Sequence, residues 1–415
     1  MSSQLRLERN KLRLLILICV CLIGMVAQVQ AQSVFVRPDR LREGDGKTRN
    51  ITLEANVSPG ATLSVAVGYR SDPSASASSF IPKFSVKDNA SEDRNPQDGK
   101  IRLVLPRAFD KIGVYSIEID EPRLVLSLVY EPNNTSYFGQ FVGWLVSAAG
   151  GGERRAGPAS ALERIEELTK NKDQDNIAIL TAPVPAAGQE IDPKSLKLSI
   201  QSALMPSWSM NGTSLACSAW RNEKWMIAAY ALNRAGVATE LWQWNSPAAG
   251  VSDFSPAWSA NGDGLVFVRL DQDQKSDVWV LEFDRNRRPK KETRVTTIGN
   301  VQAILGWDKE LGILFETKNA IEGFGSFRQV WAVKPTVPIS PVIPLSDEYG
   351  RFRGGAPLRR SVFYIDEKDS PPMSTVYEVN SNGKAKILTE ANCSHRWLAV
   401  SADERWLAFD SNCPR

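Results

Sequence analysis

The sequence predicts an all-β protein in two units, an N-terminal β-sandwich followed by an array of repeated four-stranded sheets. Short alternating apolar runs recur through the first third of the chain. In the second half, a Trp-Ser pair, an Asn-Gly turn and an apolar strand form a phrase that returns about 50 residues later. This phrase is typical of a β-hairpin, and its recurrence indicates a repeat architecture.

The repeat has two clear copies, residues 206–217 and 256–267, and three weaker ones. The weaker copies run over residues 306–315, 356–365 and 398–409. Third strands are predicted at 225–230, 278–281, 330–333 and 376–379, and fourth strands at 240–244, 293–297, 342–345 and 386–389. Four strands per repeat is the composition of a β-propeller blade. The repeated Trp and Asn-Gly residues are interpreted as packing and turn residues.

The two ends of the repeat region predict how the propeller closes. The last copy supplies only two strands, and two unpaired strand candidates, at 177–181 and 196–200, precede the first full copy. We expect the N- and C-terminal strands of the propeller to pair in one composite blade, which leaves no exposed sheet edge. This arrangement gives five blades, with six as the alternative.

The repeat resembles that of TolB-like propellers, also called WD40-like or PD40 repeats, over roughly residues 176–415. The resemblance implies a periplasmic or secreted protein that binds other proteins or caps a further domain. Some members of the family precede the hydrolase domain of a peptidase. The shared motif is structural, so it assigns no functional residue. The N-terminal unit does not look like the mixed α/β domain that precedes the propeller of TolB itself.

The N-terminal unit is predicted to cover residues 32–149, with strands at 52–57, 62–67, 101–105, 114–119 and 124–129. Residues 110–115 resemble the tyrosine corner of immunoglobulin-like folds, so we expect an Ig-like β-sandwich, with a generic sandwich as the alternative. Residues 150–175 are predicted to be a linker. Within it, residues 160–168 have helical spacing, and we expect this helix to pack against one of the two units.

The first 31 residues are predicted to be a signal peptide, with a basic start, a short apolar core and small residues before Gln32. An uncleaved N-terminal anchor is the alternative, and it would be the chain's only contact with a membrane. The signal has four basic residues and one acid, so removing its charge of +3 from the total of +3 leaves a neutral chain. Neutrality argues against nucleic acid as a partner. We expect a periplasmic or secreted location.

The chemistry-bearing residues are sparse. The sequence lacks a Gly-x-Ser-x-Gly elbow and a phosphate-binding loop, and His395 is its one histidine. We therefore predict no catalytic residue, no metal site and no cofactor. The acids Asp271, Asp273 and Asp277 are interpreted as solvated loop residues rather than calcium ligands. Cys393 and Cys413 flank the last hairpin and could form a disulfide, and Cys217 is expected to be buried.

Two groups of basic residues are candidates for contact with a partner. Arg351, Arg353, His395 and Arg396 are predicted to lie on one face of the propeller, where a small anionic ligand could bind. The alternative is that the arginines are salt-bridged surface residues and His395 is structural. A second basic group forms a predicted hairpin tip near the rim, with Arg285, Arg287, Arg288, Lys290 and Lys291. It is interpreted as a solvated turn, with contact to anionic surface polymers as the alternative.

The sequence thus favours a non-enzymatic recognition or scaffold protein of the cell envelope that binds a protein partner. One alternative is a propeller-class enzyme, a lyase or hydrolase acting on glycans through carboxylates or arginines. The other is an extracytoplasmic sensor domain that keeps its N-terminal anchor.

Overall fold

The computed structural model describes most of the chain as β-strands. It covers residues 34–37, 40–42, 50–74, 76–88, 99–120, 123–132, 160–233, 235–321, 325–335, 342–345, 361–369, 372–380 and 383–413. The predicted signal peptide and the Gly-rich part of the predicted linker lie outside these residues. No helix in the described part of the chain is both long and apolar enough to span a membrane.

The N-terminal unit is a sandwich of two sheets. The smaller sheet has the order β1-β3-β6, with β1 (Val34–Arg37), β3 (Thr52–Asn56) and β6 (Lys100–Val104) antiparallel. The larger has the order β2-β8-β7-β4-β5, with strands β2 (Arg40–Arg42), β4 (Thr62–Arg70), β5 (Ser78–Lys87), β7 (Gly113–Ile119) and β8 (Leu124–Glu131). All five strands that the sequence predicted in this unit are present, whereas β1, β2 and β5 were not predicted.

Alternating apolar residues from both sheets form one core. Leu53 and Leu103 of the smaller sheet are buried against Val65 and Ile117 of the larger one. Tyr115 is fully buried in this core, and its hydroxyl donates to the Lys111 carbonyl (2.8 Å) and accepts from the Lys111 amide (3.1 Å). These bonds close the corner that precedes β7, as the sequence predicted. Burial raises the pKa of the Tyr115 hydroxyl well above its usual range, so it stays protonated.

Three complete four-stranded antiparallel sheets, here called blades, follow one another along the chain. The first blade has strands β11 (Ala203–Trp208), β12 (Ser214–Arg221), β13 (Lys224–Leu232) and β14 (Ala238–Trp244). The second has β15 (Ser252–Trp258), β16 (Gly264–Leu270), β17 (Ser276–Phe283) and β18 (Pro289–Arg294). The third has β19 (Val301–Asp308), β20 (Gly312–Ile321), β21 (Gly325–Val333) and β22 (Val342–Leu345).

Two further sheets complete the described part of the array. A fourth blade has three described strands, β23 (Ser361–Asp369), β24 (Pro372–Asn380) and β25 (Gly383–Ala391). The composite blade has the order β10-β9-β27-β26 and joins β9 (Ala178–Pro183) and β10 (Lys197–Gln201) to β26 (His395–Val400) and β27 (Trp406–Ser411). Two short 3-10 helices, η1 (Gln174–Asn176) and η2 (Pro193–Ser195), flank β9. The predicted pairing of the propeller's first and last strands is confirmed.

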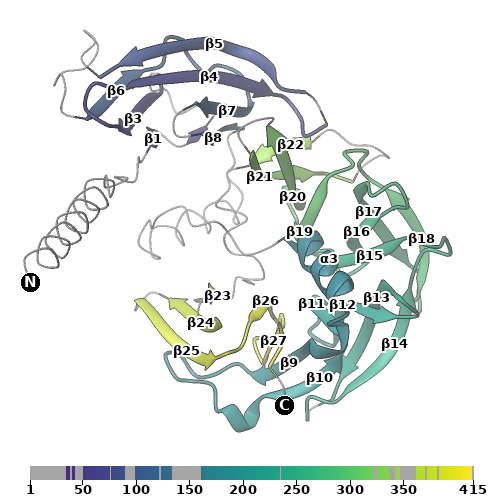
Figure 1. The fold of residues 1–415 in the computed structure, drawn as a ribbon. Coiled ribbons are helices and arrows are strands. Elements are labelled where there is room, and N and C mark those ends of the chain that lie inside the picture. Colours follow the sequence, from purple (N-terminus) through teal and green to yellow (C-terminus); the bar gives the residue numbers. More distant parts are fainter. Residues whose placement is uncertain are drawn as a thin grey trace, which may run out of the picture.

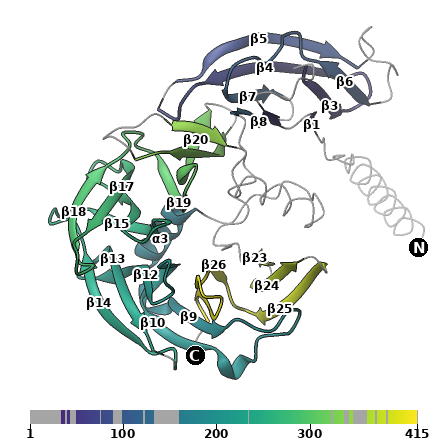
Figure 2. The ribbon, with the colours of Figure 1, turned by 180° about the vertical axis from the view of Figure 1, so that it is seen from behind.

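The blades radiate from their innermost strands in an arc (Figure 1), and the view from behind shows the same order (Figure 2). The innermost strands β26, β11, β15 and β19 contact one another in that succession, and β23 contacts β26. These contacts form four junctions between neighbouring sheets. A closed five-bladed ring needs a fifth junction, between the third blade and the fourth. The chain that connects these two blades includes residues 346–360, which lie outside the described residues. Full closure therefore stays a prediction. The sandwich lies beside the third blade, with β8 against β21 and β22.

The serine of the repeated Trp-Ser phrase fixes the turn between the first and second strands of a blade. In the first blade, the Ser209 hydroxyl donates to the Asn211 side chain (2.7 Å) and accepts from the Ser214 amide (3.0 Å). Gly212 takes the left-handed conformation at φ 65°, which its missing Cβ allows. Ser401 of the composite blade bonds in the same way, to Asp403 and the Trp406 amide, whereas Ser259 of the second blade donates to Asp263 and accepts from the Gly264 amide. These residues thus build the turns, as the sequence indicated.

The innermost strands share a bulge that the sequence did not predict. Met205, Ser255 and Trp397 occupy the same position in three repeats, and each has a positive φ between 45° and 58°. The bulge turns polar groups toward the neighbouring blade. The Ser255 amide donates to Ser218 of the first blade (2.9 Å), and the Ser255 hydroxyl accepts from the Ile304 amide of the third (3.0 Å). At Ser255 the bulge therefore joins the second blade to the first and the third by hydrogen bonds.

The predicted linker helix, α3 (Ala161–Asn171), packs on the blade array near its centre (Figure 1). Ser160 caps it in a capping box with Glu163, and its buried face contacts β15 and β19. The Glu163 carboxylate pairs with Lys318 (2.8 Å) and Arg328 (2.5 Å) of the third blade. The helix is thus held by charge as well as by apolar contact.

Candidate functional site

The two ends of the blades are different surfaces. Leu204 and Met205, at the start of β11, share a core with the apolar residues of α3. The strand runs away from the helix and ends at Trp208, where the turn to β12 begins. Because neighbouring strands are antiparallel, the turns between first and second strands and between third and fourth strands lie together at this far end. The helix therefore covers part of one end, and these turns project from the other.

A groove of about 650 Å³ lies between the first and second blades at the end away from α3. Its lining includes four large apolar residues, Met210, Leu241, Trp242 and Trp258, and two arginines, Arg287 and Arg288. We call it the Trp groove. Its remaining lining is Ser209, Asn211, Thr213, Ser214, Ala231, Asn261, Gly262 and Asn286. This lining contains no carboxylate, imidazole or thiol.

The apolar part of the Trp groove combines fixed and exposed side chains. The rings of Trp258 and Phe283 are stacked with centroids 5.3 Å apart, and Trp242 lies 5.4 Å from Phe283 and 6.3 Å from Trp258. Met210 is 52% exposed and Leu241 is 50% exposed, and both line the same groove. The groove therefore has a rigid aromatic wall and flexible apolar edges that a partner could cover.

The basic tip between β17 and β18 borders the apolar wall. The side chains of Arg285, Arg287 and Arg288 are exposed, and among the described residues they form no ion pair. Lys291 pairs with Glu282 at 3.5 Å, in an exposed and therefore weak contact. The Asp284 side chain accepts from the amides of Asn286 and Arg288, so it fixes the turn. The tip thus presents arginine charge to solvent next to apolar side chains.

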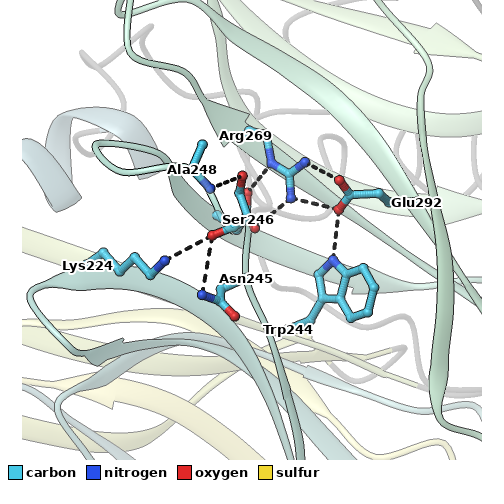
Figure 3. A network of polar contacts seen from close by, with 8 residues as sticks. Lys224, Trp244, Asn245, Ser246, Ala248, Arg269 and Glu292 are labelled. Atoms are coloured by element: carbon cyan, nitrogen blue, oxygen red, sulfur yellow. Dashed lines mark hydrogen bonds and ion pairs between the residues drawn. The ribbon is translucent and has the colours of Figure 1, made fainter.

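A buried charge network lies between the first and second blades (Figure 3). The Arg269 guanidinium donates to both oxygens of Asp253, at 2.6 and 2.9 Å, and to both oxygens of Glu292, at 2.6 and 2.8 Å. The Trp244 indole, from the first blade, also donates to Glu292 (2.9 Å). Nearby, Lys224 donates to the Ser246 carbonyl (2.9 Å). The network therefore holds the two blades together.

The two carboxylates of this network differ in protonation behaviour. Burial raises the pKa of Asp253 above its usual value, although Arg269 counteracts the rise. At Glu292 burial acts in the same direction, but hydrogen bonds from Arg269 and Trp244 outweigh it and lower the pKa. Arg269 itself is only 7% exposed. Because Asp253, Arg269 and Glu292 are hydrogen-bonded to one another, we interpret the network as structural.

The structure places His395 inside the composite blade. Its side chain is fully buried, its Nδ1 lies 2.9 Å from the Ser411 hydroxyl, and its ring meets Phe409 edge-on. The His395 amide donates to Ser374 of β24 (2.8 Å). This burial does not support the expectation that His395 faces a ligand, and it matches the structural alternative.

The other predicted site residues are only partly described. Arg396 is half-buried on β26, opposite Asp410 in the strand register. Arg351 and Arg353 lie outside the described residues, so their predicted place on a propeller face is untested. Cys393 and Cys413 are joined by a disulfide, with their Cα atoms 5.2 Å apart. Cys217 is fully buried, as expected, and burial raises the pKa of its thiol above the usual range.

The acids near β17 have structural partners. The Asp271 carboxylate accepts from the amides of Asp273 and Lys275, both at 2.9 Å, which fixes a turn. The prediction that Asp277 is a solvated loop residue is wrong, because it lies in β17, is buried and pairs with Arg294 at 2.5 Å. Within the described residues, no three His, Cys, Asp or Glu side chains converge as a metal site would require.

Comparisons with known proteins place the chain only distantly. No protein-family model matches it. No curated protein sequence matches it either. Among solved structures, TolB from Acinetobacter baumannii is similar at 13% identity and a TM-score of 0.31, over 73% of this chain and 78% of that one. A putative TolB from Agrobacterium tumefaciens is similar at 12% identity and a TM-score of 0.32, over 58% of this chain and 99% of that one.

An enzyme is also among the similar structures. An acylaminoacyl peptidase from Pyrococcus horikoshii is similar at 14% identity and a TM-score of 0.26, over 47% of this chain and 34% of that one. At these identities and TM-scores the likenesses support no inference about function. The sheets themselves define the class: an all-β protein with a two-sheet sandwich and an array of four-stranded antiparallel blades.

The Trp groove and the Arg269 network were not predicted from the sequence. The Asn-Gly turns and the basic tip were recognised separately, but nothing in the chain indicated that they border one groove. A signal for the network was present. Asp253 and Arg269 are the charged residues of two otherwise uncharged strands of one hairpin, and they are register partners in the structure.

Proposed function

We propose that this chain is a non-enzymatic recognition protein of the cell envelope, an Ig-like sandwich joined to a closed five-bladed propeller that binds a protein. The Trp groove is the observation that supports the proposal. It combines exposed apolar side chains with arginines that form no ion pair within the described part of the chain, and its lining contains no carboxylate, imidazole or thiol. A periplasmic or secreted location is part of the proposal.

The enzyme alternative needs convergent titratable groups at an open surface. Three carboxylates with a shifted pKa, Glu163, Asp253 and Glu292, are instead paired with cations in contacts between elements. Asp403, whose pKa is lowered, pairs with Arg405 within one turn. Burial and the Glu163 charge raise the pKa of Glu166 on α3, which lies outside the lining of the Trp groove. This observation favours binding over catalysis. The sensor alternative concerns the predicted N-terminal anchor, which lies outside the described residues.

The test is a crosslinking capture from native cell envelopes with the full-length chain as bait. We expect one protein to be captured reproducibly, with crosslinks that map to the turns at the end of the blades away from α3. As a parallel measurement, the protein is incubated with a panel of acidic and neutral glycans, and the length of each glycan is followed by size-exclusion chromatography. Absence of any protein partner together with cleavage of a glycan would contradict the proposal and favour the enzyme.

A further inference from the structure

The Trp groove has both apolar and positively charged side chains, so it suits a ligand with apolar and acidic groups. We propose that it binds an extended acidic peptide segment of the partner, with the apolar side chains of the peptide against Met210 and Leu241 and its carboxylates on Arg287 and Arg288. This inference rests on the proposed function and adds to it the place of the site and the class of ligand.

Charge complementarity identifies the acidic part of the ligand. Arg287 and Arg288 are exposed in the lining of the groove and form no ion pair among the described residues. Arg285 and Lys290 add exposed positive charge to the same tip. Arginine binds carboxylates through two parallel N–H donors, so a peptide with glutamate or aspartate is the natural complement.

The apolar wall identifies the rest of the ligand. Trp258 is stacked on Phe283 and Trp242 meets Trp258 edge-on, so these rings already pack against one another. The most exposed apolar atoms belong instead to Met210 and Leu241, whose flexible aliphatic side chains adapt to other apolar side chains. A sugar ring binds by stacking on a free aromatic face, whereas one face of Trp258 is already covered by Phe283. The groove therefore favours a peptide over an acidic glycan.

The probe is a fluorescein-labelled peptide with a central run of leucine and phenylalanine between glutamates, and binding is followed by anisotropy with the full-length chain. Three comparison ligands separate the contributions. One peptide carries lysines for glutamates, one carries serines for the apolar run, and an oligogalacturonate carries matched charge without apolar side chains. We expect the acidic apolar peptide to bind at least about tenfold more tightly than each of them.

Variants then locate the site. The double change R287E/R288E should weaken binding of the acidic peptide by about tenfold or more, and raising the salt concentration should weaken binding to the unaltered chain. The matched control K194E/K275E makes the same change in net charge at exposed lysines away from the groove, and it should leave binding unchanged.

The apolar contact has its own pair of variants. Leu241→Ser should weaken binding about fivefold, because roughly half of a leucine side chain loses its burial. Val237→Ser removes an apolar side chain that is 58% exposed and lies outside the groove lining, and it should have no effect. Both sites are exposed, so neither change should impair folding.

The outcomes distinguish the inference from the proposed function. Equal binding of the glutamate and lysine peptides, full binding by R287E/R288E, or tighter binding of oligogalacturonate would overturn the inference. If envelopes still yield a protein partner in that case, the proposed function stands and its site is elsewhere. If neither the peptide nor an envelope protein binds, both fail.

Discussion

Removing Arg269 should destabilise the protein by about 4 kcal/mol, because it leaves a buried carboxylate without its cation. Asp253 is 1% exposed and receives two short hydrogen bonds from Arg269, at 2.6 and 2.9 Å. Breaking such a buried pair from one side costs about 3–5 kcal/mol. Glu292 is 26% exposed and keeps the Trp244 indole as a donor, so it adds little to the loss.

The assay is urea unfolding at neutral pH, followed by tryptophan fluorescence and circular dichroism. Arg269→Met keeps most of the apolar volume, and D253N/R269M also removes the buried charge, so the double variant should recover about half of the loss. Arg285→Met is the matched control, since this arginine is exposed in the same blade, and it should change stability by less than about 0.5 kcal/mol.

The pH dependence provides a second check with a defined sign. In Arg269→Met, the buried Asp253 should have a folded-state pKa well above the unfolded value of about 3.9. A carboxyl with a raised folded pKa favours the folded state at low pH, and this advantage is lost as the pH rises through that pKa. The variant should therefore lose most stability at neutral pH and less near pH 4.5. A loss below about 1 kcal/mol at neutral pH, or one that does not change with pH, would show that Arg269 does not neutralise a buried Asp253 charge.

Three further results are expected. Glu404 has φ 57° at the turn position that Gly262 occupies in the second blade, so Glu404→Gly should stabilise the protein by about 1 kcal/mol and Gly262→Ala should destabilise it by about as much, measured by urea unfolding. Because the Cys393–Cys413 disulfide spans a sequence separation of 20, replacing both cysteines by serine should lower the unfolding free energy by about 3 kcal/mol, with no further effect of reductant on the variant. Burial raises the pKa of Glu163, but hydrogen bonds from Lys318 and the Ser160 amide outweigh burial and hold the pKa at about 2. The stability that Glu163 contributes to the folded state is therefore present above pH 4.5 and lost as the pH falls toward 2. Glu163→Gln should abolish that part of the acid sensitivity in pH-dependent unfolding.

The strand repeat could be predicted because its signals are local. The Asn-Gly turn and the apolar strand that follows it are adjacent in sequence. Each hairpin can therefore be recognised from one short stretch of the chain. The composite blade followed from the strands that remained unpaired. The strand β5 was not predicted because Pro82 interrupts its apolar run, and β5 is an edge strand of its sheet, where a missing amide donor is tolerated.

The Trp groove could not be predicted because it is assembled across long sequence distances. Met210, Leu241, Trp258 and Arg287 come from four separate segments, and only the packing of the first blade on the second brings them together. The helical spacing of residues 160–168 likewise identified an apolar face but not its partner, since periodicity contains no information about what covers a face. His395 was assigned to a strand correctly, but its burial depends on β24 and β27 around it.

Site-specific photocrosslinking can show whether a protein partner contacts the Trp groove. A photoreactive amino acid is placed at Met210, on the edge of the Trp groove, and for comparison at Leu198, which is 41% exposed on the outer strand of the composite blade. The account predicts that irradiation of native envelopes gives a protein adduct from position 210, that the acidic peptide competes with it, and that position 198 gives none. Adducts from position 198 alone, or none from position 210 with the chain folded, would contradict it.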